Sequence, residues 1–433
     1  MNIELMTLSE LERVEGELGN FTVTLRRRPR YVDMERCLAC GECARVCPKS
    51  VKDEFNEGLT NRKAAYIKYP QAVPHKYQID PDHCIRLSGD RCGACLTACP
   101  SGAISFDETE TMVDVSVGSI ILAPGFSAFD PSGIRTWGYG VFPNVLTTME
   151  LERYLLASGP SRGRLVRPSD GEPVKRLAFL QCVGSRDYNK SSHGYCSSTC
   201  CMSALKQAMI AMDHVKDLEV SIFFTDMRAH WKDFERYYER ARERGVKFHR
   251  CRVHSLEPVG TSGDIYFRYI TDDGKQVKAE FDMVVLSIGM QPPAEVEKLA
   301  EVTGVALNDN GFAVTPSFAP AHTSRPGIYA CGAFLGPMEI AQTVIRASAA
   351  ASSAALPLSN VRHSIARQKE FPAERDVNGE EVRIGVFICH CGSNIAGVID
   401  VEAVARYAAT LPGVVYVERS LFSCSQDSQE LLR

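Results

Sequence analysis

The stretch that decides the fold reads Cys37-Leu38-Ala39-Cys40-Gly41-Glu42-Cys43-Ala44-Arg45-Val46-Cys47-Pro48. Its spacing is C-x2-C-x2-C-x3-C-P, a pattern that wraps a [4Fe–4S] cluster. Three thiolates at two-residue intervals converge on one cubane, and the fourth, which precedes a proline, ligates the other cluster of a pair. The stretch therefore predicts a second cysteine block elsewhere in the chain.

That second block consists of Cys84 and of Cys92-Gly93-Ala94-Cys95-Leu96-Thr97-Ala98-Cys99-Pro100. Its first gap is longer than two residues, so a small loop from Ile85 to Arg91 has to bulge out. We expect the two ligand sets to cross between the blocks. One set is Cys37, Cys40, Cys43 and Cys99, and the other is Cys84, Cys92, Cys95 and Cys47. The alternatives are a zinc site and a disulfide framework, but zinc sites use two separated C-x-x-C pairs.

The composition is that of a protein with two or three packed domains, because 45% of the 433 residues are hydrophobic and 24% are charged. A net charge of −4 gives no case for binding nucleic acid or an anionic membrane surface. The 17 cysteines fall largely in cluster-type spacings, which favours a reducing cytosol over a secreted disulfide scaffold. No apolar run reaches the roughly 18 residues of a membrane span, and the N-terminus has no signal-peptide pattern. We therefore expect a cytoplasmic protein without a transmembrane segment.

We expect five segments along the chain. Residues 1–30 are a lead-in with a helical stretch from Leu8 to Val14 and a strand from Asn20 to Leu25. Residues 31–107 form the double-cluster α+β module, which a polar and aromatic insertion from Lys52 to Gln78 interrupts. Residues 108–355 form an α/β nucleotide-domain-like region, and 356–381 are a linker. Residues 382–433 begin a further domain with a short βαβ pattern.

Strand and helix patterns alternate in the middle of the chain. The expected strands are Arg176–Val183, Leu218–Phe224 and Val246–Cys251, and the expected helices are Thr199–Met212 and Lys232–Arg244. This alternation predicts a parallel sheet with covering helices. A β-hairpin follows, with Tyr266–Ile270 and Gln276–Phe281 around Asp272-Asp273-Gly274.

Three places in this region have the form of a dinucleotide site. The runs Val113–Gly125 and Phe281–Gly289 each read as an apolar strand that ends in a glycine, although an ordinary buried strand and turn gives the same pattern. Further on, Cys331-Gly332-Ala333 leads into a helix of small residues from Ile340 to Ala355. A strand–glycine–helix arrangement presents backbone N–H groups to an anionic or polar cofactor edge. The alternative is a small-residue helix packed in a core.

A third cysteine constellation lies in the expected parallel sheet. Cys182 ends a strand, and Cys196, Cys200 and Cys201 follow across a polar loop, with the last two at the start of a helix. Strand ends and helix starts of such sheets meet where ligands bind. We therefore favour a third cluster, with a redox disulfide or buried free thiols as alternatives. Cys389, His390, Cys391 and Cys424 are a fourth, weaker candidate for binding metal.

Together these features resemble the A-type, iron–sulfur flavoprotein component of heterodisulfide reductase and its relatives. The resemblance rests on the two cysteine blocks, on Gln181-Cys182-Val183-Gly184-Ser185-Arg186-Asp187, on Tyr195-Cys196-Ser197-Ser198-Thr199-Cys200-Cys201-Met202, and on Cys331-Gly332-Ala333 with Gly336-Pro337. It implies a thioredoxin-reductase-like flavin domain with an inserted ferredoxin module, and a cluster on Cys182, Cys196, Cys200 and Cys201. It also implies FAD at Gly125 and at Gly332, Ala333, Glu339, Ile340 and Ala341, and it makes residues 382–424 similar to the amino-terminal domain of the same component.

One feature departs from the resemblance. Flavoproteins of this type bind the FAD diphosphate with a strand, G-x-G-x-x-G and a helix, and this sequence has no such motif. We therefore expect an incomplete flavin domain whose first half is supplied by another polypeptide or by a longer form of the chain.

The resulting hypothesis is an electron-transfer subunit of a heterodisulfide-reductase-type oxidoreductase, a type that includes flavin-bifurcating complexes, without a catalytic acid, base or nucleophile of its own. Its partners would be other subunits of that type and a hydrogenase, formate dehydrogenase or ferredoxin donor. One alternative is a pyridine-nucleotide-dependent flavin oxidoreductase of the glutamate-synthase small-subunit type. The other is a cluster-bearing scaffold without flavin.

Overall fold

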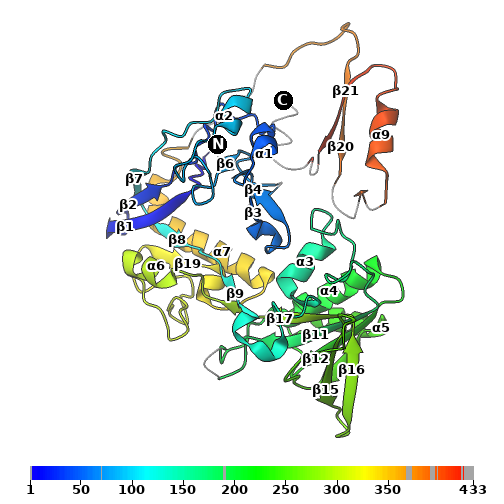
Figure 1. Ribbon diagram of the computed structural model, residues 1–433. Helices are drawn as coiled ribbons and strands as arrows, with labels where there is room; N and C mark the ends of the chain where they lie inside the picture. Colours follow the sequence, from blue (N-terminus) through cyan, green and yellow to red (C-terminus); the bar gives the residue numbers. More distant parts are fainter. Residues whose placement is uncertain are drawn as a thin grey trace.

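The computed structural model describes residues 2–69, 71–188, 192–366, 373–390, 395–396, 398–420 and 423. An antiparallel sheet in the order β1-β2-β7 forms one side of the molecule (Figure 1). Its strands are β1 (Ser9–Glu17), β2 (Asn20–Arg27) and β7 (Thr111–Val117). The helix expected from Leu8 to Val14 is therefore wrong. Pairing overrides the local pattern, because β1 aligns with β2 from Ser9 to Glu17 and places Val14 opposite Val23.

The cysteine module follows β2 and leads back into β7. It contains two short helices that pack on each other, α1 (Glu42–Val46) and α2 (Ala94–Ala98). Its strands form two antiparallel pairs: β3 (Ser50–Lys52) with β4 (Asn61–Lys63), and β5 (Ala65–Tyr66) with β6 (Gln78–Ile79). The expected insertion is thus the β3–β4 hairpin, with a 3₁₀ turn at Glu54–Asn56, and the β5–β6 pair.

The predicted parallel sheet is present, with five strands in the order β10-β17-β11-β12-β13. They are β10 (Val145–Thr147), β17 (Met283–Ile288), β11 (Arg176–Val183), β12 (Glu219–Phe224) and β13 (Lys247–Arg250). The helices α3 (Thr148–Leu155), α4 (Cys200–His214) and α5 (Phe234–Glu243) pack with the sheet residues Phe179 and Val285. We call the sheet, these helices and the β14–β16 strands described next the sheet domain.

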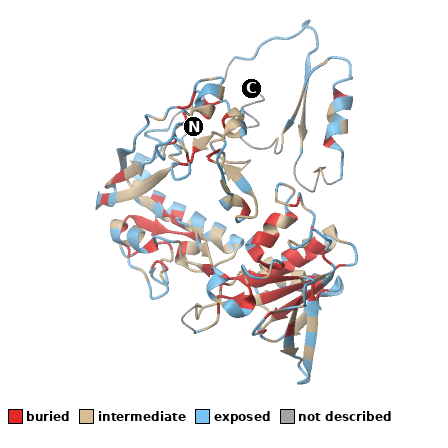
Figure 2. Ribbon diagram, viewed as in Figure 1, coloured by how far each residue is buried: buried red, intermediate tan, exposed pale blue. Residues whose placement is uncertain are grey.

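The other face of this sheet packs with a small antiparallel sheet of β14 (Glu257–Pro258), β15 (Ile265–Ile270) and β16 (Gln276–Phe281). The predicted hairpin is the β15–β16 pair of this sheet. Successive residues of a strand point to opposite faces, so Ala178 and Leu180 lie in this second core while Phe179 lies in the first. Figure 2 shows the resulting concentration of buried residues in the sheet domain.

A third group of elements surrounds a parallel pair, β8 (Ile120–Leu122) and β19 (Ile328–Ala330). The helices α6 (Val296–Thr303) and α7 (Ile340–Ala355) belong to it, as do the 3₁₀ turns Gly332–Leu335 and Leu356–Val361. The short pair β9 (Ser127–Ala128) and β18 (Met290–Gln291) marks the crossings to the sheet domain, where 3₁₀ turns at Pro131–Gly133 and Arg135–Trp137 follow. The run Val113–Gly125 ends in a strand before Pro124-Gly125 as expected, but it contains parts of two strands, because the chain leaves β7 at Gly118 and enters a different sheet as β8.

The C-terminal part contains the expected βαβ pattern: β20 (Ile384–Cys389), α9 (Val401–Ala408) and β21 (Val414–Ser420), with the two strands parallel. None of the described helices is long and apolar enough to cross a bilayer.

Candidate metal centres and flavin region

The first cysteine cavity is lined by Cys37, Cys40, Cys43 and Cys99, with Tyr77 and Ile104 beside them. Gly41 begins α1 with φ 84°, a left-handed conformation that glycine adopts without strain, and its turn brings Cys43 back toward Cys40. Burial opposes ionisation of Cys99, but hydrogen bonds from the backbone N–H of Ala103 and from the Ser101 hydroxyl lower its pKa. Cys99 comes from the second sequence block and joins three thiols of the first.

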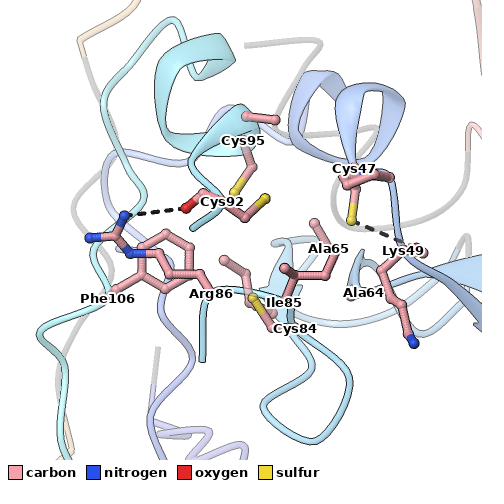
Figure 3. Close-up of a pocket in the computed structure, with 13 residues that line it drawn as sticks. Cys47, Lys49, Ala64, Ala65, Cys84, Ile85, Arg86, Cys92, Cys95 and Phe106 are labelled. Atoms are coloured by element: carbon pink, nitrogen blue, oxygen red, sulfur yellow. Dashed lines mark hydrogen bonds between the residues drawn. The ribbon is translucent and has the colours of Figure 1, made fainter. Parts of the chain in front are cut away.

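The second cavity has the complementary composition, with Cys47, Cys84, Cys92 and Cys95 around it (Figure 3). Lys49 and Ala64, at the base of the β3–β4 hairpin, form part of its wall. Arg86 covers one side, where its guanidinium donates to the carbonyl oxygen of Cys92 at 3.2 Å. The structure therefore groups the eight thiols into the same two sets of four that the spacing predicts. The binding of a cluster by each set stays a prediction.

The electrostatics of both cavities fit a cationic group. Burial, with added repulsion from neighbouring thiolates, raises the pKa of Cys43 to about 12 and also raises the pKa of Cys95. Buried thiolates this close together need positive charge nearby, and the iron of a cluster provides it. Within the described residues, no three His, Cys, Asp or Glu side chains converge as tightly as a single metal ion requires. Each set instead encloses a cavity between four thiols.

The third constellation also comes together. Cys182 stands at a bulge at the end of β11 with φ 64°, which turns its side chain out of the alternating strand pattern. Cys200 and Cys201 begin α4, and hydrogen bonding among the thiols lowers the pKa of Cys200 while raising the pKa of Cys182 and Cys201. Cys196 lies close enough to raise the pKa of Cys182 further. The four predicted thiols therefore lie in one group, in which Cys182, Cys200 and Cys201 are buried and Cys196 is half-buried.

Several buried polar atoms around this third group fit a ligand with sulfur acceptors. Within the described part of the chain, Ser185 Oγ is buried and has no hydrogen-bond partner, whereas the Ser197 hydroxyl and the Arg186 guanidinium interact with the thiols of Cys200 and Cys182. Ser185 and Ser197 both lie against Gly289 at the end of β17, where a Cβ atom would approach Ser185 Oγ to 2.3 Å. Buried donors normally have partners. Inorganic and thiolate sulfur would supply acceptors here, so the site fits an iron–sulfur cluster better than it fits four free thiols.

The residues expected to contact FAD lie at the carboxyl ends of β8 and β19. Gly125 follows β8, and Gly332 and Ala333 follow β19, so adjacent parallel strands bring these segments together. Glu339 caps α7, and burial, with a smaller contribution from Cys200, raises its pKa to about 7. Glu339 therefore lies within electrostatic range of Cys200 in the third cysteine group. Ile340 is 83% exposed, and Ala341 is also exposed. Contact of any of these residues with FAD stays a prediction.

The fourth candidate group is only partly described. Cys389 ends β20, and the backbone N–H of His390 donates to the Ser420 carbonyl oxygen at 2.8 Å. Cys391 and Cys424 lie outside the described residues.

Sequence reasoning missed three kinds of residue near these sites. Lys76 Nζ donates to the Cys37 carbonyl oxygen at 2.8 Å, and the Tyr77 hydroxyl lies 3.1 Å from where a Gly41 Cβ would be. Both come from the insertion, which has no motif of its own. The serines Ser185 and Ser197 are close to the cysteines in sequence, and this proximity was the available signal.

Comparisons with known proteins match the two parts of the molecule separately. Among solved structures, the chain is similar to a thioredoxin reductase from Lactococcus lactis, with 15% identity, coverage of 69% of this chain and 86% of that one, and a TM-score of 0.37. The family of pyridine nucleotide-disulphide oxidoreductases matches residues 194–354, and the 4Fe-4S binding domain family matches residues 30–51. These two family matches and the cysteine sites define an iron–sulfur protein built on a pyridine-nucleotide-disulphide-oxidoreductase-type α/β fold.

Curated relatives are similar to most of the chain. The chain is 42% identical over 395 residues to the A-type iron-sulfur subunit of "CoB--CoM heterodisulfide reductase" from Methanocaldococcus jannaschii, an alignment that covers 90% of this chain and 58% of that protein. It is 40% identical over 363 residues to the A-type subunit of "H(2):CoB-CoM heterodisulfide,ferredoxin reductase" from Methanothermobacter thermautotrophicus, with coverage of 82% of this chain and 54% of that protein.

The chain is homologous over most of its length to the A-type heterodisulfide reductase subunits, and it spans a little over half the length of these relatives. The matches assign [4Fe–4S] clusters and FAD as its cofactors.

Proposed function

We propose that this chain is an electron-transfer subunit of a heterodisulfide-reductase-type complex, in which electrons pass between [4Fe–4S] clusters and FAD. The observation that carries the proposal is the grouping of twelve cysteines into three sets of four. Two sets occupy the cysteine module, and the third is within electrostatic range of Glu339 in the flavin region. Such an order of sites is what a chain of one-electron carriers leading to a flavin requires.

The protein's own residues supply ligands, burial and hydrogen bonds. When bound, a [4Fe–4S] cluster takes up or releases one electron at a potential that hydrogen bonds and solvent exposure tune. Cys40 is exposed, whereas Cys200 and Cys201 are buried. The first set is therefore the better placed to exchange electrons with a partner protein, and the third is the better shielded from water.

For the flavin, we propose that another nucleotide-binding unit completes the site. Among the described residues, β8 and β19 form a parallel sheet of two strands, although parallel sheets are normally covered on both faces. On α7, Ile340, Val344 and Ile345 are 83%, 60% and 58% exposed. A strand and helix from another chain, or from a longer form of this one, would cover these residues and bring the glycine-rich diphosphate loop.

The partners we propose are other subunits of the same type and a hydrogenase, formate dehydrogenase or ferredoxin donor. Relatives support this choice through their names, which include "H(2)/formate:CoB-CoM heterodisulfide,ferredoxin reductase" for the protein from Methanococcus maripaludis. We also propose a cytoplasmic location, since the free thiols suit a reducing compartment.

The test is anaerobic purification followed by measurement of iron, sulfide and FAD in one sample. We expect about twelve iron atoms per chain, at four for each cubane. In Cys200→Ser we expect about eight, and in Cys251→Ser, a matched change at a half-buried cysteine outside the three sets, we expect about twelve. About eight irons in the unmodified chain would remove the third cluster, and absence of FAD even with its partner present would leave a cluster-bearing scaffold.

A second candidate function is NAD(P)H-dependent flavin reduction, as in glutamate-synthase small subunits. The match to pyridine nucleotide-disulphide oxidoreductases over residues 194–354 favours it. Against it, cysteines stand where the sheet domain would need a glycine-rich phosphate loop, at Cys182 and Cys196–Cys201. Bleaching of the flavin by NADH or NADPH alone, without a donor protein, would favour this second function.

A further inference from the structure

The β3–β4 hairpin joins the second cysteine set to the sheet domain. Its base forms part of the wall around Cys47, Cys84, Cys92 and Cys95, and its tip reaches toward α3 (Figure 1). We propose that this hairpin is a strut that fixes the second set relative to the third, and that Arg153 of α3 is the positioning residue at its tip. The proposal rests on the proposed function only in that both sets hold clusters.

The base of the hairpin is tied to the cysteine loop. Arg62, at the end of the hairpin, is mostly buried and pairs with Asp80 at 2.9 Å. Asp80 accepts the backbone N–H of Cys84 through its own carbonyl oxygen at 3.0 Å. Arg62 also binds Glu54 at the other end of the hairpin and lies 3.8 Å from the centre of the Tyr66 ring. The hairpin therefore moves with the loop that carries Cys84.

The tip has a closed set of hydrogen bonds. Asp53 accepts from the backbone N–H of Phe55 at 3.1 Å and from the Asn56 side-chain amide at 2.9 Å. The same amide nitrogen donates to Thr60 Oγ1 at 2.8 Å. These contacts use the nitrogen of the Asn56 side chain and leave its oxygen to face α3.

Arg153 of α3 contacts this tip. Its Nε donates to the Asn56 side-chain oxygen at 2.9 Å, and its guanidinium lies 4.2 Å from the centre of the Phe55 ring. Phe55 in turn stacks on Tyr69 at 5.0 Å. Arg153 is only 7% exposed, although burying a guanidinium is unfavourable. A buried arginine with so few partners stabilises weakly, but its planar donors fix one orientation of the tip.

Rigid elements continue from Arg153 to the third set. α3 packs on α4, where Gln207 donates to the Thr148 carbonyl oxygen and to Glu152, both at 2.9 Å. Lys206 also pairs with Glu152 at 2.6 Å. α4 begins with Cys200 and Cys201, so hairpin, α3 and α4 form one continuous path between the two cysteine sets.

The experiment compares the full chain with Arg153→Met, which keeps an unbranched side chain over Phe55 but removes the donor and the charge. Arg45→Met is the matched control, because Arg45 is exposed and pairs with Glu42 within the module. Amide hydrogen exchange is measured anaerobically over residues 53–60. Since a hydrogen bond to a charged group is lost, exchange there should rise about tenfold in Arg153→Met and stay unchanged in Arg45→Met. Pulsed EPR of the reduced protein should show a broader range of couplings between the second and third clusters, with the iron content unchanged.

Unchanged exchange and unchanged coupling in Arg153→Met would overturn the proposal. If that variant does not fold, Phe55→Leu removes the ring contact from the other side and is judged by the same two measurements. An unmodified chain with about eight irons would contradict the proposed third cluster, yet the exchange measurement would still decide whether Arg153 holds the hairpin.

Discussion

The cysteine module and the sheet domain hold their thiols in different ways. In the module, four of the nine residues of the buried cluster are cysteines, and its helices have only five residues each. In the sheet domain, the core beneath α4 is made of aliphatic and aromatic side chains, and the thiols stand at its rim. The module therefore needs its ligand to complete a core, whereas the sheet domain builds its site on a core that exists without one.

The largest effect should follow removal of iron. Chelation of the unmodified chain should unfold residues 31–107, because the buried thiols lose the group between them and no comparable apolar core remains among the described residues of the module. The sheet domain should stay folded. Hydrogen exchange on the apo and holo proteins checks both parts at once, with β11 and β17 as the internal reference. An equal increase in exchange in both regions would show that the sheet domain also depends on iron for its fold.

A substitution in the core of the sheet domain should destabilise that domain and leave the cysteine module intact. Phe179→Ala removes a fully buried ring between the sheet and its helices, so it should lower the free energy of unfolding of the sheet domain by about 3–5 kcal/mol. Phe318→Ala, at a fully exposed ring, is the control and should change it by less than about 0.5 kcal/mol. Denaturant unfolding followed at the sheet domain measures the change. The iron of the first two sets should remain bound, and its loss would mean that the regions unfold as one unit.

A smaller effect is expected at α3, the helix through which the two regions touch. Thr147 and Glu150 form a capping box in which each side chain accepts the other's backbone N–H. Thr147→Ala should lower the free energy of unfolding of the sheet domain by about 1–2 kcal/mol, since it leaves a buried helix start without its cap. Ser348→Ala on the exposed side of α7 is the control. Denaturant unfolding of both variants measures the change. An equal loss in the free energy of unfolding of the two variants would show that the Thr147 cap does not stabilise α3.

The same comparison explains what the sequence predicted well. Cysteine spacing determined the two sets of the module, because a cubane imposes close limits on its ligands. The strand pattern of Arg176–Val183 and the run of small residues Ile340–Ala355 predicted β11 and α7 with their observed bounds. Both signals are local in the sequence, and the structure contains the groups of cysteines and the elements that they predict.

Non-local features were harder to predict. The stretch from Leu8 to Val14 has a helical pattern but forms β1, because it pairs with the neighbouring β2, which is itself paired with the distant β7 (Thr111–Val117). The contact of Arg153 with Asn56 joins positions 97 residues apart and has no sequence motif. Ser185 and Ser197 are close to the cysteines in sequence, but only the structure shows that the Ser185 hydroxyl is buried without a partner in the described part of the chain and that Ser197 interacts with Cys200.

The smallest effect should be a pH dependence confined to the sheet domain. His249 in β13 stacks on Phe223 at 4.7 Å, and burial, with repulsion from Lys247, lowers its pKa below the ordinary 6.5. As the pH falls through 6.5, the unfolded chain takes up a proton on His249 that the folded chain does not, so stability decreases with falling pH and is constant above that range. His249→Phe keeps the stack and should remove this decrease. Thermal unfolding of both chains between about pH 5.5 and 7.5 measures it. The difference should be the same with and without iron, because His249 belongs to the region whose fold does not depend on the clusters.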